Sequence, residues 1–181
     1  AEIVTVNHSG VYAYYHDGTP FWSTTAVASW RFFGTPSVGN LDLDAEAEIV
    51  VNLDTDLVVF DSNGTILWQT GDTDGWGIPV LADLTGDGLL DVLVHDLDDT
   101  LHLYDYNLGN PQLVWTAVFT NPVHGFGAPA VADLDLDGIP EVAMATETLL
   151  FALNSEDGSI QWTAPLDPGR TGGVTIADID G

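Results

Sequence analysis

Acidic side chains recur at fixed spacing in three short segments of this sequence. Each segment carries oxygen-bearing side chains at positions 1, 3, 5 and 9, and two of the three have glycine at position 6. Hard cations such as calcium take about six to eight oxygen ligands, and alternate residues of a tight loop can point inward together. We therefore predict three calcium-binding loops. Their ligands are Asn40, Asp42, Asp44 and Glu48 in the first loop, Asp83, Thr85, Asp87 and Asp91 in the second, and Asp133, Asp135, Asp137 and Glu141 in the third.

The three loops are not expected to bind calcium equally well. The third loop has four carboxylates together with Gly138, so it is the strongest predicted site. The second loop has Thr85 in place of one carboxylate. The first loop has Ala45 at position 6, where a positive φ angle would cost alanine roughly 1 kcal/mol.

The acidic loops lie within a repeat of about 46 residues. Trp22, Trp68, Trp115 and Trp162 follow one another at intervals of 46, 47 and 47 residues. Each repeat reads as a short apolar strand, the acidic loop, a second apolar strand, an alternating third strand, a tight turn and a fourth strand that carries the Trp. Repeats of this length with several short strands are typical of propeller blades. We predict an all-β fold, a β-propeller of four-stranded antiparallel blades with the calcium loops between the first and second strands.

The repeat divides residues 1–181 as one propeller or propeller segment. The predicted units are residues 1–30, which supply strands two to four of a blade, then 31–72, 73–121 and 122–166, and finally 167–181, which supply the first strand of a further blade.

Composition excludes several classes of partner. The formal net charge is −26, with only two Lys or Arg residues. Nucleic acid is excluded because its binding depends on cationic neutralisation of phosphates. No apolar run of about 18 residues or more is present to span a membrane. So large a negative charge repels itself, and bound cations would offset that cost. The 10% aromatic content argues against a disordered acidic chain.

The sequence predicts no catalytic site. The five histidines form no metal-binding spacing, and no nucleophile motif occurs. The three predicted calcium loops account for 11 of the 28 Asp and Glu residues. We therefore expect a protein that is not an enzyme. Asn7 and Asn63 each begin an N-glycosylation triplet, Asn7-His8-Ser9 and Asn63-Gly64-Thr65, so both are candidate modification sites.

These residues resemble the FG-GAP and VCBS repeats of integrin α subunits and many bacterial surface proteins. The resemblance rests on the aromatic-Gly pairs Phe33-Gly34, Trp76-Gly77 and Phe126-Gly127, each followed by a proline, and on the acidic loops. The family implies the same calcium ligands and an extracellular or cell-surface location. It also implies a role in adhesion, scaffolding or surface assembly, with a protein or glycan partner. The alternative role is an accessory propeller of a carbohydrate-active enzyme.

The two ends of the chain carry halves of a fourth loop. Asp178 and Asp180 occupy positions 1 and 3, and Glu2 occupies position 9. Three explanations stay open. The chain is an excerpt of a longer propeller, it closes on itself as a four-bladed ring, or its last strand completes the first blade of another copy. The last arrangement would make it a self-assembling filament subunit, and either joined arrangement would bring Glu2 near Asp178 and Asp180.

Overall fold

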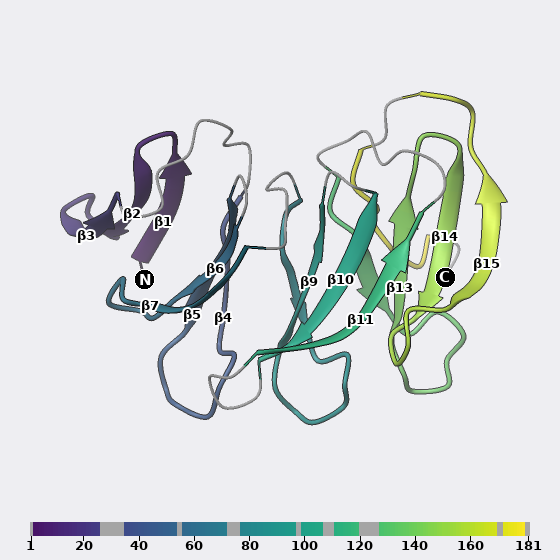
Figure 1. Cartoon of the computed structure of the whole chain (residues 1–181), viewed down its shortest axis with the longest axis horizontal. Coiled ribbons are helices and arrows are strands. Elements are labelled where there is room, and N and C mark those ends of the chain that lie inside the picture. Colours follow the sequence, from purple (N-terminus) through teal and green to yellow (C-terminus); the bar gives the residue numbers. More distant parts are fainter. Residues whose placement is uncertain are drawn as a thin grey trace.

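The computed structural model consists of β-sheets standing side by side in a row (Figure 1). It describes residues 2–25, 35–53, 56–71, 77–96, 99–106, 111–119, 127–169 and 172–179. Within these ranges every regular element is a β-strand, and all strand pairs are antiparallel. The predicted all-β fold of four-stranded antiparallel blades is confirmed.

Each sheet is built from strands that follow one another in the sequence, so neighbouring strands are joined by local connections. The first sheet contains β1 (Glu2–Asn7), β2 (Gly10–Tyr15) and β3 (Pro20–Thr24). The second contains β4 (Ser37–Gly39), β5 (Glu48–Leu53), β6 (Asp56–Phe60) and β7 (Ile66–Thr70). The third contains β8 (Val80–Ala82), β9 (Asp91–His95), β10 (Thr100–Asp105) and β11 (Gln112–Val118). The fourth contains β12 (Ala130–Ala132), β13 (Glu141–Ala145), β14 (Leu149–Asn154) and β15 (Ile160–Pro165).

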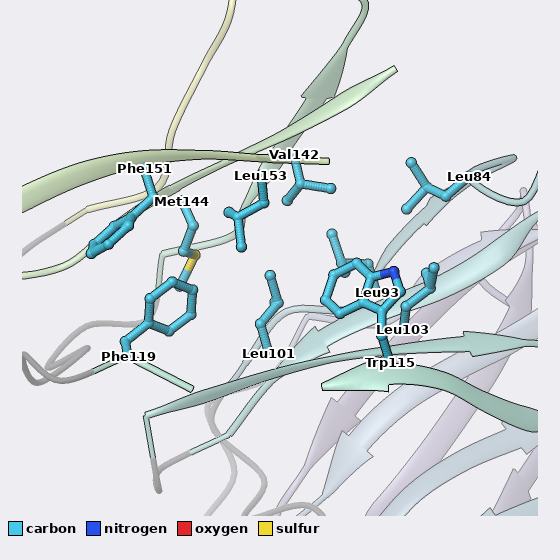
Figure 2. Packing of buried hydrophobic residues seen from close by; sticks show 10 residues of the cluster. All are labelled: Leu84, Leu93, Leu101, Leu103, Trp115, Phe119, Val142, Met144, Phe151 and Leu153. Carbon is cyan, nitrogen blue, oxygen red and sulfur yellow. The ribbon is translucent and has the colours of Figure 1, made fainter. Parts of the chain in front are cut away.

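Apolar side chains fill the spaces between successive sheets. Strands β5 and β9 are buried along their whole length because both of their faces meet a neighbouring sheet. One cluster, which includes Val11 and Phe60, joins the first two sheets, and another, which includes Val59 and Tyr104, joins the second and third. Figure 2 shows the cluster between the third and fourth sheets, in which Trp115 and Leu103 face Val142 and Leu153. The hydrophobic effect therefore holds each sheet against the next one.

The repeating tryptophans dock on the following sheet. The Trp22 indole N–H donates to the carbonyl of Ser62 at 2.8 Å, and the Trp115 indole N–H donates to the carbonyl of Ser155 at 2.6 Å. Trp68 packs against Tyr104, with ring centroids 5.4 Å apart. The period of about 46 residues read from the sequence is thus the spacing of one sheet-to-sheet contact.

Inner strands also meet across the row. Strand β4 contacts β8, and the Ser37 hydroxyl donates to the carbonyl of Pro79 at 2.6 Å. Residues 172–179 are not assigned to a strand, and the Val174 N–H donates to the carbonyl of Ala128 at 3.1 Å. This segment therefore begins beside the fourth sheet, much as β8 lies beside β4.

Several residues singled out in the sequence lie outside the described ranges. They are Phe33, Gly34, Trp76, Phe126 and Asp180. The part of the chain that the structure describes contains no helix long and apolar enough to cross a membrane.

Candidate metal centres

The three acidic loops connect the first and second strands of their sheets. They lie between β4 and β5, between β8 and β9, and between β12 and β13, and they project along the lower edge of the row in Figure 1. Both flanking strands are short and paired to each other, so the loop ends are held at a fixed separation. The fold therefore places the predicted ligands of each loop on one rigid frame.

A buried carboxylate closes each loop. Glu48, Asp91 and Glu141 stand at position 9 and are 1%, 1% and 2% exposed. Each accepts a hydrogen bond of 2.7 Å from the backbone N–H at position 2, which belongs to Leu41, Leu84 or Leu134. A charge-assisted bond of this kind fixes the side chain. The carboxylate at position 9 thus has a backbone partner that the spacing of side chains does not reveal.

Carboxylates gather in two of the loops. Oxygen atoms of Asp42, Asp44 and Glu48 lie within 4.8 Å of one another. In the third loop, carboxylate oxygens of Asp133, Asp135 and Glu141 also lie within 4.8 Å of one another. These are acidic clusters that could hold a metal ion.

The second loop replaces one carboxylate of such a cluster with a hydroxyl. The Thr85 hydroxyl lies 3.4 Å from a carboxylate oxygen of Asp91, and the Thr85 N–H donates to the other oxygen at 2.8 Å. Asp83 accepts bonds from the N–H groups of Gly86 and Gly88, and Asp87 accepts one from Leu89. The second loop therefore carries less negative charge, while hydrogen bonds to its carboxylates hold its backbone as in the other loops.

The first loop does not contain the strain expected at Ala45. Gly88 and Gly138, at position 6, have φ of 91° and 94°, and their N–H groups donate to Asp83 and Asp133 at 3.0 Å. Ala45 is not among the described non-glycine residues with positive φ. The expected cost was wrong because this loop turns differently: the Asn40 amide donates to the carbonyl of Asp44 at 2.7 Å.

Burial of the closing carboxylates has an electrostatic cost. Desolvation raises the pKa of Glu48, and the neighbouring charges of Asp42 and Asp44 raise it further, against the bond from Leu41. Desolvation likewise raises the pKa of Asp91. Both shifts mean that the ionised form lacks sufficient positive charge nearby, and a bound cation would supply that charge.

Tyr106, which directly follows β10, lies close to the first loop. It is 1% exposed and packs in the same cluster as Leu41, and its hydroxyl has no hydrogen-bond partner among the described residues. Burial and the charges of Glu48 and Asp42 raise its pKa to about 12. The sequence of the first loop gives no sign that Tyr106, far along the chain, lies beside it.

A second polar cluster braces the third sheet. Asp96, 5% exposed, accepts hydrogen bonds from the N–H and hydroxyl of Thr100 and lies 3.0 Å from His102 Nε2. The other nitrogen of His102 lies 3.0 Å from the Thr116 hydroxyl on β11. Burial acts to raise the pKa of Asp96, but the bonds from His102 and Thr100 outweigh it and hold this pKa below its ordinary value. The cluster ties the β9–β10 connection to the outer strand.

The remaining predicted residues are placed as follows. Glu2 begins β1 and is exposed, unlike its buried counterparts, and Asp178 lies in the segment 172–179. Figure 1 shows β1 at one end of the row and the segment 172–179 beside the fourth sheet toward the other end, so one molecule does not bring Glu2 and Asp178 together in this structure. Asn7 and Asn63 are exposed, and their side-chain oxygens accept bonds from Ser9 and Thr65 in turns.

With the sheets and loops described, the fold is that of a β-propeller built from antiparallel sheets. Residues 83–144 match the family model of the FG-GAP-like repeat, which spans the second and third acidic loops. The recognition of an FG-GAP-type repeat in this chain is therefore confirmed. No curated protein sequence matches the chain.

Solved structures with the same fold share little sequence with this chain. The rhamnogalacturonan lyase YesW matches with a TM-score of 0.63 and 17% identity over 85% of this chain and 35% of its own. The Vibrio cholerae biofilm matrix protein Bap1 matches with a TM-score of 0.64 and 10% identity, over 96% of this chain and 56% of its own length. BamB from Moraxella catarrhalis matches with a TM-score of 0.56 and 19% identity, over 90% of this chain and 50% of its own length. The chain thus spans between about a third and somewhat over half of these proteins, and the likeness establishes the fold alone.

Proposed function

We propose that this chain is a non-enzymatic, calcium-binding β-propeller module of an extracellular or cell-surface protein, with a role in adhesion, scaffolding or surface assembly. The observation that carries the proposal is the loop repeated in three sheets, each closed by a buried carboxylate at position 9. Its partner would be a protein or glycan at the cell surface, or further copies of itself.

Calcium is the cation that these ligands favour. The loops offer carboxylate, hydroxyl and amide oxygens, and the sequence contains no cysteine, so soft metals lack their preferred ligand. Calcium sites of extracellular modules commonly have weak affinities, about 10⁻⁴–10⁻³ M. Such sites fill outside the cell, where calcium is abundant. This argument supports the extracellular location together with the FG-GAP-like repeat.

A binding role accounts for the acidic residues better than catalysis does. The gathered carboxylates lie in loops that repeat from sheet to sheet, whereas a catalytic site is normally built once. The likeness to the biofilm matrix protein Bap1 supports a matrix or surface role, and the likeness to the lyase YesW supports the second candidate, an accessory propeller beside a carbohydrate-active domain. Binding of this chain to plant pectin fragments but not to other surface glycans would favour that second candidate.

Thermal unfolding tests the calcium proposal. A ligand that binds only the folded state adds about 2.7 kcal/mol per site at a hundredfold excess over its dissociation constant. For a chain of this size each kcal/mol raises Tm by about 2–4 °C. We expect millimolar calcium to raise Tm by several degrees over a chelator, and magnesium at the same ionic strength to raise it much less. Equal midpoints in calcium and chelator would show the proposal to be wrong.

Two charge-matched variants locate the effect. Asp135→Asn removes a gathered carboxylate from the third loop and should reduce the calcium-dependent rise in Tm. Glu156→Gln removes the same charge from an exposed turn and should leave the rise unchanged. If both variants reduce it equally, calcium acts through general charge neutralisation and not through the loops.

A further inference from the structure

A buried hydroxyl stands beside the first acidic loop without a hydrogen-bond partner. Tyr106 is 1% exposed, and its hydroxyl forms no hydrogen bond with any group among the described residues. Buried polar groups of this kind are rare in folded proteins, and a bound water or ion is one explanation for them. The Tyr106 hydroxyl is therefore a candidate contact for a bound group at this loop.

The surroundings of this hydroxyl include both apolar and acidic residues. Tyr106 packs in the cluster between the second and third sheets, together with Leu41 at position 2 of the first loop. The charges that act on its hydroxyl are those of Glu48 and Asp42, at positions 9 and 3. Both belong to the group of three residues whose carboxylate oxygens lie within 4.8 Å of one another. The ring therefore extends from the third sheet toward the acidic cluster of the second.

Tyrosine stands at a place of the repeat where the neighbouring sheets have serine. Three residues after the partner of each repeat tryptophan come Ser62 in the second sheet, Tyr106 in the third and Ser155 in the fourth. A serine hydroxyl is one bond from Cβ, whereas a tyrosine hydroxyl is at the far end of a ring. Among these three residues, Tyr106 alone is long enough to extend a hydroxyl to the loop of the preceding sheet.

The first and third loops differ in the donors that their own sheets supply. Gln161 Nε2 donates to Glu141, the closing carboxylate of the third loop, at 3.4 Å. Gln161 directly precedes the repeat tryptophan, and Leu67, which has no side-chain donor, stands at the same place of the second sheet. The second sheet therefore offers Glu48 no donor from that place, and Tyr106 of the next sheet brings a hydroxyl to this loop instead.

The protein ligands of the first loop leave positions for bound water. The Asn40 amide is used within the loop, since its oxygen accepts from the Asp42 N–H at 3.2 Å and its nitrogen donates to the Asp44 carbonyl at 2.7 Å. Three carboxylates gather here, whereas calcium takes about six to eight oxygens and often includes water among them. Water bound to a divalent cation is a strong donor, so a hydroxyl oxygen that lacks a partner fits beside it.

We propose that Tyr106 is part of the first calcium site and binds the ion through a water, which its hydroxyl oxygen accepts as a hydrogen-bond donor. The inference rests on the proposed calcium-binding function and adds to it a residue from the neighbouring sheet. Calcium at this loop thereby links the second sheet to the third. Residues that hold the ligands of a metal in this way commonly contribute about 10–100-fold to its affinity.

Calcium titrations followed by amide resonances test this role one loop at a time. The Leu41 N–H donates to Glu48 and reports on the first loop, and the Leu134 N–H donates to Glu141 and reports on the third. In Tyr106→Phe we expect the calcium dissociation constant measured at Leu41 to rise about 10–100-fold. The constant measured at Leu134 should not change.

A matched variant controls for the substitution itself. Tyr14→Phe removes a hydroxyl from a half-buried tyrosine of β2, in the first sheet, and should change neither constant. Urea unfolding in chelator separates binding from packing. Tyr106→Phe keeps the ring in its cluster and removes a hydroxyl without a described partner, so its urea midpoint should not fall below that of the unaltered chain. A lower midpoint would mean that the protein itself holds the hydroxyl, and would overturn the proposal.

The titrations also distinguish this inference from the calcium proposal. If neither amide of the unaltered chain responds to calcium, both proposals are wrong. If both amides respond and Tyr106→Phe leaves the constant at Leu41 unchanged, only the role of Tyr106 is wrong. The same conclusion holds if Tyr106→Phe weakens both loops equally, because the substitution then acts on the whole fold and not on the first loop.

Discussion

The backbone angle φ at position 4 differs between acidic loops of similar sequence. Gly86 and Leu136 occupy this position in the second and third loops with φ of 76° and 67°. Leu43 occupies it in the first loop and is not among the described residues with positive φ. Both leucines are largely exposed, at 86% and 76%, so packing does not distinguish them. The third loop, which gathers its carboxylates from positions 1, 3 and 9, therefore holds a leucine in a conformation that favours glycine.

Replacing these two leucines with glycine should have opposite effects. The left-handed conformation costs a non-glycine residue roughly 1–2 kcal/mol, and glycine adds about 0.5–1 kcal/mol of unfolded-state entropy. Leu136→Gly should therefore raise the free energy of unfolding by up to about 1 kcal/mol, and Leu43→Gly should lower it by about 0.5–1 kcal/mol. Urea unfolding of both variants in calcium measures the difference. Equal changes would mean that Leu136 is not strained.

At the scale of elements, the turn between the third and fourth strands is the receptor for the neighbouring sheet. Its glycine serves two purposes that the sequence alone cannot separate. It provides the positive φ of a tight turn, and it leaves room for an indole ring from about 40 residues away. Gly158 and Gly18 share the first purpose, but only Gly158 has a described ring, that of Trp115, above it.

Alanine at these two turns should distinguish the purposes. Both substitutions place a Cβ at positive φ and should cost roughly 1–2 kcal/mol. Gly158→Ala also forces Trp115 to move, and overpacking of this kind adds about 1–3 kcal/mol. Urea midpoints of the two variants measure the difference. A cost at Gly158 no greater than that at Gly18 would mean that the indole contact contributes little.

At the scale of the whole molecule, repulsion between negative charges is the main electrostatic contribution that destabilises the fold. The net charge of −26 is distributed over a row of sheets whose loops gather carboxylates rather than separating them. Apolar clusters between the sheets supply the opposing free energy. Because the repulsion is electrostatic, it should respond to screening and to bound cations in different ways.

Sodium chloride should therefore stabilise the calcium-free chain. The Debye length falls from about 30 Å at 0.01 M to about 3 Å at 1 M ionic strength, so distant carboxylates cease to repel one another. Tm measured in chelator should rise across this range, and the rise should be smaller in millimolar calcium, where the loops are already neutralised. A Tm that does not depend on salt in chelator would show that repulsion costs the fold little.

Local patterns in the sequence determined much of this protein. Alternating and apolar strands, turn glycines and the Trp period are short-range signals, because a strand needs only its own side-chain pattern to define its two faces. They predicted the four-stranded sheets and the position of each acidic loop between two strands. The ligand spacing likewise predicted that acidic side chains would gather in the first and third loops, since a loop of nine residues brings its own side chains together.

Only the tertiary structure decided how those residues are used. It buries Glu48 against Leu41, gathers Asp42 and Asp44 in the first loop, and brings Tyr106 beside them from the next sheet. It also avoids the strain expected at Ala45. These features depend on contacts between segments far apart in the chain and on the backbone angle that each loop adopts, and neither is encoded in the spacing of a single motif.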